Sequence, residues 1–359
     1  MKQVVMLESL CNNERGWAKV MSRSGRVALV QLEGFGFTEH VEVWHNGEMV
    51  EFTTPKKCIR LAIIDKATWG GVLALTTIRR GWRVMMSQRT DVTIGNVTSM
   101  AAAALFFRAI GRTRKVVSLV CDYFPPHPKL HIRVYRWIGA TITRWLCKWS
   151  DEVWYVSPRI PTVTANPRRY QIPLYINDEK VPATNRTEIG YIGMPSQDHA
   201  LEILFEVCRK HQIVLNVIGK SDYLDSIKHL APSNTVFHGL ISNSEKIKTI
   251  MSRCFCGYAI YRNIGPHNYS YYGIPSKMLN YFANNTPVIT TNTADFTQNV
   301  SKFGIGRIVE PAFNQIETAV LDIRNRFPEY FDAINRFRET WNAGVQKFHD
   351  ERLAELLKD

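Results

Sequence analysis

The stretch best suited to chemistry lies late in the chain, at residues 273–290, with the sequence GIPSKMLNYFANNTPVIT. Pro275 suits the first position of a helix, where its missing N–H group is no loss. The N–H groups of Ser276, Lys277 and Met278 would then point out of the start of that helix. Together with the helix dipole and the Lys277 ammonium group, they predict an anion site suited to a diphosphate.

The remainder of the stretch predicts how this site is positioned. Asn280 lies one turn beyond Lys277, on the same face of the expected helix. Asn284 and Asn285 can end the helix in a left-handed turn, and residues 287–290 then form a strand. The alternative is an ordinary amphipathic helix with a solvated lysine. The combination of Pro, Lys, Tyr and Pro-Val-Ile at these spacings favours the anion site.

This stretch resembles the donor-binding helix of family 4-type GT-B glycosyltransferases, whose pattern is roughly Pro-x-Lys-x-x-Glu-Tyr-x-Ala-x-x-x-Pro-Val-Ile. The resemblance implies an α/β protein of two Rossmann-like domains that face each other across a cleft. It also implies that Ser276 and Lys277 hold the phosphates of a nucleotide-sugar, and that Asn280 meets the ribose. The expected donor, a substrate and not a cofactor, is a UDP-sugar.

Two further segments carry the same resemblance. Residues 189–202 resemble the strand, glycine turn and helix that open the C-terminal domain, and Gly193 would let the backbone approach the phosphates. Residues 215–220, ending at Lys220, resemble the next strand and turn. In this half the resemblance covers residues 189–292. It is weaker in the N-terminal half, where its segments are residues 90–94, 116–122 and 151–157.

The sequence departs from the family pattern at four positions. Met194 stands where the family usually has Arg, and His199 stands where it usually has Lys, which weakens the positive clamp on a diphosphate. Tyr272 and Asn280 stand where it usually has two glutamates, and the first of these usually contacts the sugar. These losses leave an inactive GT-B homologue open as an alternative.

A looser similarity, carried by Met194 and by Lys277 with an amide three residues later, links the sequence to bacterial exopolysaccharide glucuronosyltransferases. It implies an acidic donor sugar such as glucuronate. Arg262 could bind a phosphate or a sugar carboxylate, because arginine binds oxyanions through two parallel hydrogen bonds. A solvated surface charge explains Arg262 equally well.

Asp122 is the first candidate for a catalytic base. It ends an expected strand at residues 116–122, and inverting transfer needs a base for the acceptor hydroxyl group. A capping or turn role before Pro125 is an equal alternative. Glu14 and Asp65 are the next candidates. A retaining enzyme would need no such base, so the stereochemistry stays open.

The basic excess lies in the N-terminal half, where residues 1–185 hold 26 Lys and Arg against 14 Asp and Glu, within a net charge of +13. Such a field favours a polyanionic partner. The expected helix at residues 132–149 has an apolar face that we expect to be buried on the sheet. Its members are Val134, Ile138, Ile142, Trp145, Leu146 and Trp149. The opposite face carries Arg133, Arg136, Trp137, Arg144 and Lys148.

That basic face suits phospholipid headgroups or a polyprenyl diphosphate. We therefore expect a peripheral protein at the cytoplasmic face of the membrane, with a lipid-linked or glycan acceptor. No signal peptide is recognisable, which favours the cytoplasm. No apolar run reaches the ~18 residues that a membrane span needs. The seven cysteines lack metal-binding spacing and are expected to be reduced.

Other functions are less well supported. A nucleotide-sugar 2-epimerase shares the GT-B architecture but would leave the basic half unexplained. The high charge invites a nucleic-acid partner, but no recognisable motif accompanies it, and we expect none. The absence of G-x-G-x-x-G argues against NAD. No Asp-x-Asp occurs, so we expect an enzyme that works without a metal.

The elements that must position these residues alternate between strands and helices in both halves, which predicts parallel sheets covered on both faces. Ligands bind such sheets at the carboxyl ends of their strands. Prolines between residues 158 and 182 mark a boundary between the two halves. We expect domains at residues 1–185 and 186–340, followed by a C-terminal helix at residues 341–359.

Overall fold

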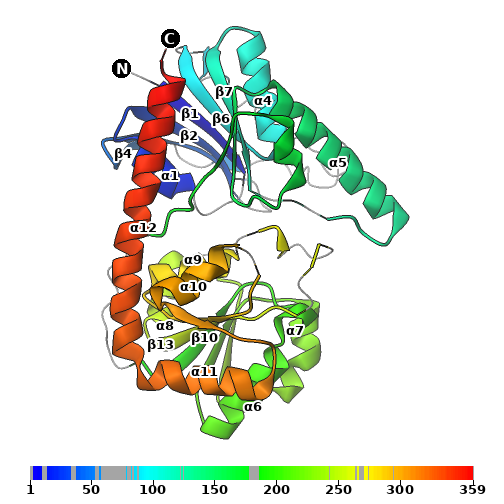
Figure 1. Ribbon diagram of the computed structural model, residues 1–359, viewed down its shortest axis with the longest axis vertical. Helices are drawn as coiled ribbons and strands as arrows, with labels where there is room; N and C mark the ends of the chain where they lie inside the picture. Colours follow the sequence, from blue (N-terminus) through cyan, green and yellow to red (C-terminus); the bar gives the residue numbers. More distant parts are fainter. Residues whose placement is uncertain are drawn as a thin grey trace. The chain divides into compact units, whose positions relative to one another are not determined.

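The computed structural model describes residues 3–9, 14–33, 38–52, 56–57, 78, 82, 85–86, 89–121, 123, 125–177, 186–241, 243–262, 265–266, 271–273, 275–293 and 295–358. The chain forms two compact units (Figure 1). The first comprises Met1–Tyr175 and Ala343–Asp359, and the second comprises Ile176–Asn342. The boundary predicted at residue 185 borders residues 178–185, which lie outside the described part of the chain.

The sheet of the first unit is mixed. Its described strands are β1 (Gln3–Ser9), β2 (Arg26–Glu33), β3 (Thr38–His45), β4 (Glu48–Phe52), β5 (Lys56–Lys57), β6 (Thr90–Asn96), β7 (Thr113–Val120), β8 (Glu152–Tyr155) and β9 (Arg169–Gln171). Their order is β4-β3-β2-β1-β6-β7-β8-β9, and β5 pairs with β3. The pairings from β2 through β1 to β9 are parallel.

The antiparallel pairings of β3 with β2, β4 and β5 correct the expectation of an all-parallel sheet. The pairing of β3 with β4 arises from a tight hairpin. Asn46 and Gly47, which connect these strands, both have positive φ, at 52° and 83°. An Asn-Gly pair adopts this backbone readily, and it matches the twist of two antiparallel strands. That dipeptide was the available sequence signal.

Helices pack on this sheet and on one another. Those that lie wholly within the described part of this unit are α1 (Glu14–Met21), α4 (Val97–Ala109), α5 (Leu130–Trp149) and the short η1 (Pro161–Ala165). Helix α4 lies on β1, β6 and β7, and its apolar side chains, such as Met100 and Phe107, join Val5 and Leu7 in a buried core. Helix α5 makes its main contacts with α4 and η1 instead of with the strands.

The last helix, α12 (Phe327–Leu356), begins in the second unit and ends in the first. In the first unit, Phe348 and His349 contact the ring of Trp154 on β8, each with centroids 5.5 Å apart. Arg352 forms an ion pair with Glu152 on the same strand. The C-terminal residues of α12 are therefore part of the core of the N-terminal unit.

The second unit has a fully parallel sheet, as expected. Its strands are β10 (Glu188–Ile192), β11 (Leu215–Ile218), β12 (Thr235–Gly239), β13 (Cys254–Ala259), β14 (Val288–Thr290) and β15 (Gly306–Ile308). Their order is β12-β11-β10-β13-β14-β15. This is the doubly wound order in which the chain reverses direction between its first and fourth strands, here β10 and β13.

Helices on both faces of this sheet bury its apolar side chains. They are η2 (Gln197–His199), α6 (Leu201–His211), α7 (Asp222–Ile227), η3 (Lys228–Leu230), α8 (Ser244–Met251), α9 (Ser276–Ala283), η5 (Asp295–Thr297), α10 (Gln298–Phe303), α11 (Phe313–Asn325) and the first part of α12. The helix predicted after Pro275 is confirmed as α9, which ends at Ala283, directly before Asn284. Asn285, with φ of 52°, makes the predicted left-handed turn after it.

Candidate functional site

The carboxyl end of β10 and the start of α9 lie together in the second unit. Gly193 follows β10 with a φ of 129°, a conformation that favours glycine. A Cβ atom at Gly193 would stand 3.6 Å from Cε of Lys277 and 3.8 Å from its Nζ. The structure thus brings together two residues that are 84 positions apart and that sequence analysis placed on the same ligand.

Lys277 is buried among aromatic rings, with a side chain only 8% exposed. Its Nζ donates a hydrogen bond to the Tyr191 hydroxyl group at 3.3 Å. The ammonium group lies 4.5 Å from the ring centroid of Tyr191 and 4.9 Å from that of Tyr261. Burial lowers the pKa of Lys277 from 10.5 to about 7. An anion placed here would restore the charge of this amine.

His199 completes this cluster and is held in one orientation. Its Nδ1 accepts a hydrogen bond from the backbone N–H of Ser196 at 2.9 Å. Its ring contacts those of Tyr191 and Tyr261, with centroids 5.8 and 5.0 Å apart. Burial, and then the charge of Lys277, lower the pKa of His199 to about 3. The imidazole is therefore neutral at pH 7, and Nε2 carries its proton.

Tyr281 fixes α9 against the sheet. Its hydroxyl group accepts from the backbone N–H of Ile192 at 3.0 Å and donates to the carbonyl group of Tyr258 at 3.0 Å. One side chain of α9 is thereby bonded to β10 and β13, the two strands at the switch point. The ring also occupies the space that a Cβ atom at Gly257 would need. No role was predicted for Tyr191, Tyr261 or Tyr281. The available signals were a tyrosine within an apolar strand, a tyrosine just after one, and a tyrosine one helical turn beyond Lys277.

The helix start differs from the expectation in one respect. Pro275 precedes the first helical residue, and its carbonyl group accepts the N–H of Met278 at 2.9 Å. The predicted anion site therefore has at most two of its three backbone donors, those of Ser276 and Lys277. Ser276 is exposed and Asn280 is partly buried.

Two turns flank Gly193. Gly219 packs so closely against the Gly193 carbonyl group that a Cβ atom there would stand 1.8 Å from the oxygen. Lys220, the next residue, is exposed. Met194 is 70% exposed, so the residue that replaces the family arginine has a solvent-facing side chain.

Arg262 and Tyr272 each have a protein partner. Arg262 forms an ion pair with Glu202 on α6 at 2.5 Å, and the Tyr223 hydroxyl group donates to the same carboxylate at 3.0 Å. The charge of Arg262 is thereby balanced within the protein. The hydroxyl group of Tyr272 donates to the Pro266 carbonyl group at 3.0 Å, and its side chain is buried.

The acceptor-side candidates are only partly described. Asp122 and Asp65 lie outside the described residues, and the side chain of Glu14, at the start of α1, is not among those described either. On α5, Arg133, Arg144 and Lys148 are exposed, and Trp137 is 67% exposed. Arg136 is partly buried, and its Nη1 donates to the Pro125 carbonyl group at 2.6 Å.

The expected burial of the apolar face of α5 is wrong for three of its six residues. Val134, Trp145 and Trp149 are exposed, whereas Leu146 is buried. The reason is that α5 makes its main contacts with α4 and η1 and not with the strands, so the sheet does not cover these three side chains. Trp145 and Trp149 instead lie against each other, with ring centroids 6.1 Å apart.

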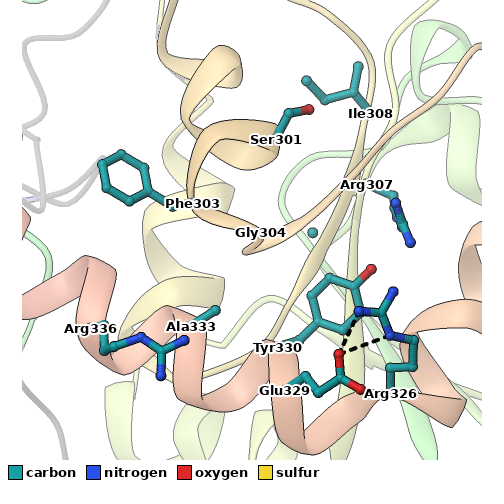
Figure 2. A pocket seen from close by; sticks show the side chains of 11 residues that line it. Ser301, Phe303, Gly304, Arg307, Ile308, Arg326, Glu329, Tyr330, Ala333 and Arg336 are labelled. Carbon is teal, nitrogen blue, oxygen red and sulfur yellow. Dashed lines mark hydrogen bonds and ion pairs between the residues drawn. The ribbon is translucent and has the colours of Figure 1, made fainter.

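A separate open pocket of about 450 Å³ lies at the β15 edge of the second sheet (Figure 2). It is lined by β15, the end of α10 and the first turns of α12. Figure 2 shows Arg326 paired with Glu329 beside Tyr330. Asp322 pairs with Arg307 and Arg326. These guanidinium groups already have carboxylate partners, and none of the predicted donor residues lines the pocket.

Among the described residues, no group of three or more His, Cys, Asp and Glu side chains is arranged to hold a metal ion. No helix in this part of the chain has the length and apolar character to cross a membrane.

Comparison with known proteins identifies the fold. No protein-family model and no curated protein sequence matches this chain. Among solved structures, the E. coli trehalose-6-phosphate protein bound with UDP-2-fluoro glucose is 10% identical, with a TM-score of 0.64, and the match covers 100% of this chain and 99% of that one. HepE from Anabaena, in complex with UDP, is 10% identical over 99% and 100% of the two chains, with a TM-score of 0.62. Sucrose-phosphate synthase from Thermosynechococcus elongatus is 11% identical over 99% and 100%, also with a TM-score of 0.62. Together with the two parallel-rich sheets, these likenesses show that the protein has the GT-B fold.

Proposed function

We propose that this protein is a glycosyltransferase that transfers a hexose from a UDP-sugar to a lipid-linked or polysaccharide-precursor acceptor. The observation that carries the donor half is the buried Lys277 beside Gly193, at the carboxyl end of β10. The helix N-terminus and an amine without a carboxylate partner among the described residues suit a diphosphate. Two proteins with the same fold were solved with UDP or a UDP-sugar bound, which supports this ligand class.

Thermal-shift measurements with UDP, GDP, ADP, CMP, dTDP and their sugars test this proposal. Ligand binding raises the stability of the folded state by mass action, by about 2.7 kcal/mol at 100 times Kd. We expect stabilisation by the uridine series. Lys277→Met, which keeps the volume of the buried chain, should weaken UDP binding by about 10- to 150-fold, as expected for a hydrogen bond to a charged group.

Lys246→Ala, at an exposed position on α8 in the same unit, is the matched control and should bind UDP as the wild type does. A well-folded wild-type protein that no nucleotide stabilises would contradict the proposal. Stabilisation by another nucleotide series would keep the donor site and change the donor base.

The acceptor half of the proposal is supported by α5. A Trp-rich and basic helix surface has the composition of segments that lie in the headgroup region of a membrane. We propose that this surface attaches the protein peripherally to the cytoplasmic face, where a lipid-linked acceptor is presented.

Asp122 remains our proposed base if the reaction inverts the anomeric centre, because it follows β7 by two residues in the chain. Asp122→Asn should then abolish transfer while UDP binding is kept. We also propose transfer without a metal ion, so a chelator such as EDTA should leave the rate unchanged.

A further inference from the structure

The C-terminal end of α9 lies against two buried arginines that the predicted donor site does not include. Nη1 of Arg186 is within hydrogen-bonding distance of the carbonyl oxygens of Asn284, at 3.0 Å, and Asn285, at 3.2 Å. Nη1 of Arg338 donates to the carbonyl oxygen of Ala283 at 3.3 Å. Arg186 and Arg338 are only 7% and 9% exposed.

Arg186 is held on its other sides as well. The same Nη1 is 3.2 Å from the Cys254 carbonyl oxygen and 3.1 Å from Oγ1 of Thr286. Its guanidinium carbon lies 5.3 Å from the ring centroid of Phe327 and 5.6 Å from that of Phe331, both on α12. Burial lowers the pKa of Arg186 to about 10, so the group is still charged at neutral pH.

The location of these charges has an electrostatic consequence. The last carbonyl groups of a helix lack partners within the helix and carry the negative end of its dipole. A buried guanidinium group, in turn, is tolerated only where it is hydrogen-bonded. The two arginines therefore stabilise the C-terminal end of α9, at Ala283 and at Asn284 and Asn285 directly after it, and these carbonyl oxygens accept hydrogen bonds from one nitrogen, Nη1, of each buried guanidinium group.

The two arginines lie near the two ends of the second unit. Arg186 stands two residues before β10, and Arg338 lies on α12, four residues before Asn342, the last residue of the unit. Residues near the beginning and near the end of this unit therefore both contact the same end of α9.

We propose that Arg186 and Arg338 are positioning residues of the donor site. By holding the C-terminal carbonyl groups of α9, they fix the helix so that Ser276 and Lys277 meet the diphosphate. This inference rests on the proposed donor site. Helix α9 has eight residues and is thus about 12 Å long. A displacement of its C-terminal end is transmitted to its N-terminal end, because so short a helix moves as one body.

The test compares UDP dissociation constants, measured calorimetrically at a temperature where circular dichroism shows each variant to be folded. Arg186→Met and Arg338→Met remove the charge and keep an unbranched side chain. We expect UDP binding to weaken by about 2- to 30-fold, the range measured for residues that act on a site without touching its ligand. Arg186→Lys, which retains a cation, should recover part of the loss.

Arg352→Met is the matched control. Arg352 is also a largely buried arginine on α12, but it pairs with Glu152 and lies 3.9 Å from the Tyr170 ring centroid, in the first unit. Its removal should lower the melting temperature without changing the UDP dissociation constant. This separates a loss of stability from a loss of positioning.

The outcomes distinguish this inference from the proposed function. If the wild type binds UDP and both methionine variants bind it equally well, the arginines are structural only and the inference is overturned. If the wild type binds no nucleotide, the proposed function fails and this inference fails with it. If Arg186→Met does not fold, the UDP dissociation constants of Arg338→Met and Arg186→Lys decide between a positioning role and a purely structural role.

Discussion

Lys277 has a pKa near 7 because it is buried, with a tyrosine hydroxyl group and two aromatic rings around its amine. A bound diphosphate favours the charged form and raises this pKa. Above pH 7 the Lys277 amine of the ligand-free protein is mostly deprotonated. Binding of the donor should therefore be accompanied by uptake of a proton at these pH values. As the pH falls below 7, the amine of the free protein is increasingly charged, and the uptake falls towards zero near about pH 6.

The measurement is calorimetric titration with UDP-glucose between pH 6 and 8.5, in buffers of different ionisation enthalpy. The diphosphate of a UDP-sugar is a diester and does not titrate in this interval. We expect affinity to fall by up to about tenfold per pH unit above pH 7. Lys277→Arg stays charged throughout and should give a flat profile. An equally flat profile for the wild type would show that donor binding is not coupled to protonation of Lys277.

His349 predicts a second pH effect, on stability. It is fully buried against Trp17 and Trp154, and neither ring nitrogen has a hydrogen-bond partner among the described residues. Burial lowers its pKa from 6.5 to about 3. Between these values the unfolded chain binds the extra proton and the folded chain does not. The free energy of unfolding is therefore not reduced by His349 above pH 6.5. Below pH 6.5 it falls by about 1.4 kcal/mol for each pH unit.

Urea unfolding of the wild type and of His349→Phe, followed by tryptophan fluorescence from pH 4 to 7.5, checks this effect. The difference in unfolding free energy between the two should grow as the pH falls. A difference that is constant with pH would show that His349 is not the titrating group.

At the scale of elements, α5 gives a prediction about membrane binding. Its exposed tryptophans and basic residues lie on one helix, and the charge attraction of each Lys or Arg to an anionic surface contributes about 1 kcal/mol. Sedimentation with vesicles of phosphatidylglycerol should therefore recover the protein, and vesicles of phosphatidylcholine should recover less. Arg144→Glu with Lys148→Glu should abolish the difference, and Trp137→Ala should weaken binding to both vesicle types.

Lys246→Glu on α8 controls for the general effect of charge, since Lys246 is exposed but belongs to the second unit. Equal recovery of the wild type and the α5 double variant would remove α5 as the membrane-binding surface.

Helices α9 and α5 differ in how much of each could be predicted from the sequence. The end of helix α9 was predicted to the residue, because the Asn284–Asn285 turn marks it locally, and Pro275 marked its start to within one residue. Helix α5 was also predicted, but its buried face was not. The face that a helix buries depends on its neighbours, and α5 is covered by α4 and η1, which periodicity does not identify. The β3–β4 hairpin was missed although Asn46-Gly47 is a local signal.

At the scale of the whole molecule, the order of strands and helices was enough to predict a two-domain α/β protein. The site was harder to predict from the sequence than the fold was. The family resemblance of residues 189–202 and 273–290 put Gly193 and Lys277 on one ligand, but the partners that shape the site lie far away in sequence. Arg262 is balanced by Glu202, and Lys277 is enclosed by Tyr191. Such contacts arise only when the sheet assembles, so single-sequence patterns do not reveal them.

The sharing of α12 between the units has a consequence for how the chain folds. The second unit is continuous, Ile176–Asn342, and has all its residues once position 342 is synthesised. The first unit is complete only after Phe348, His349 and Arg352 have been synthesised, because these residues contact Trp154 and Glu152. Domains usually fold in order of synthesis; here the N-terminal unit should be completed last. Truncation at residue 342 should leave the second unit resistant to proteolysis and the first unit sensitive, and limited trypsin digestion of the truncated chain would show which part survives.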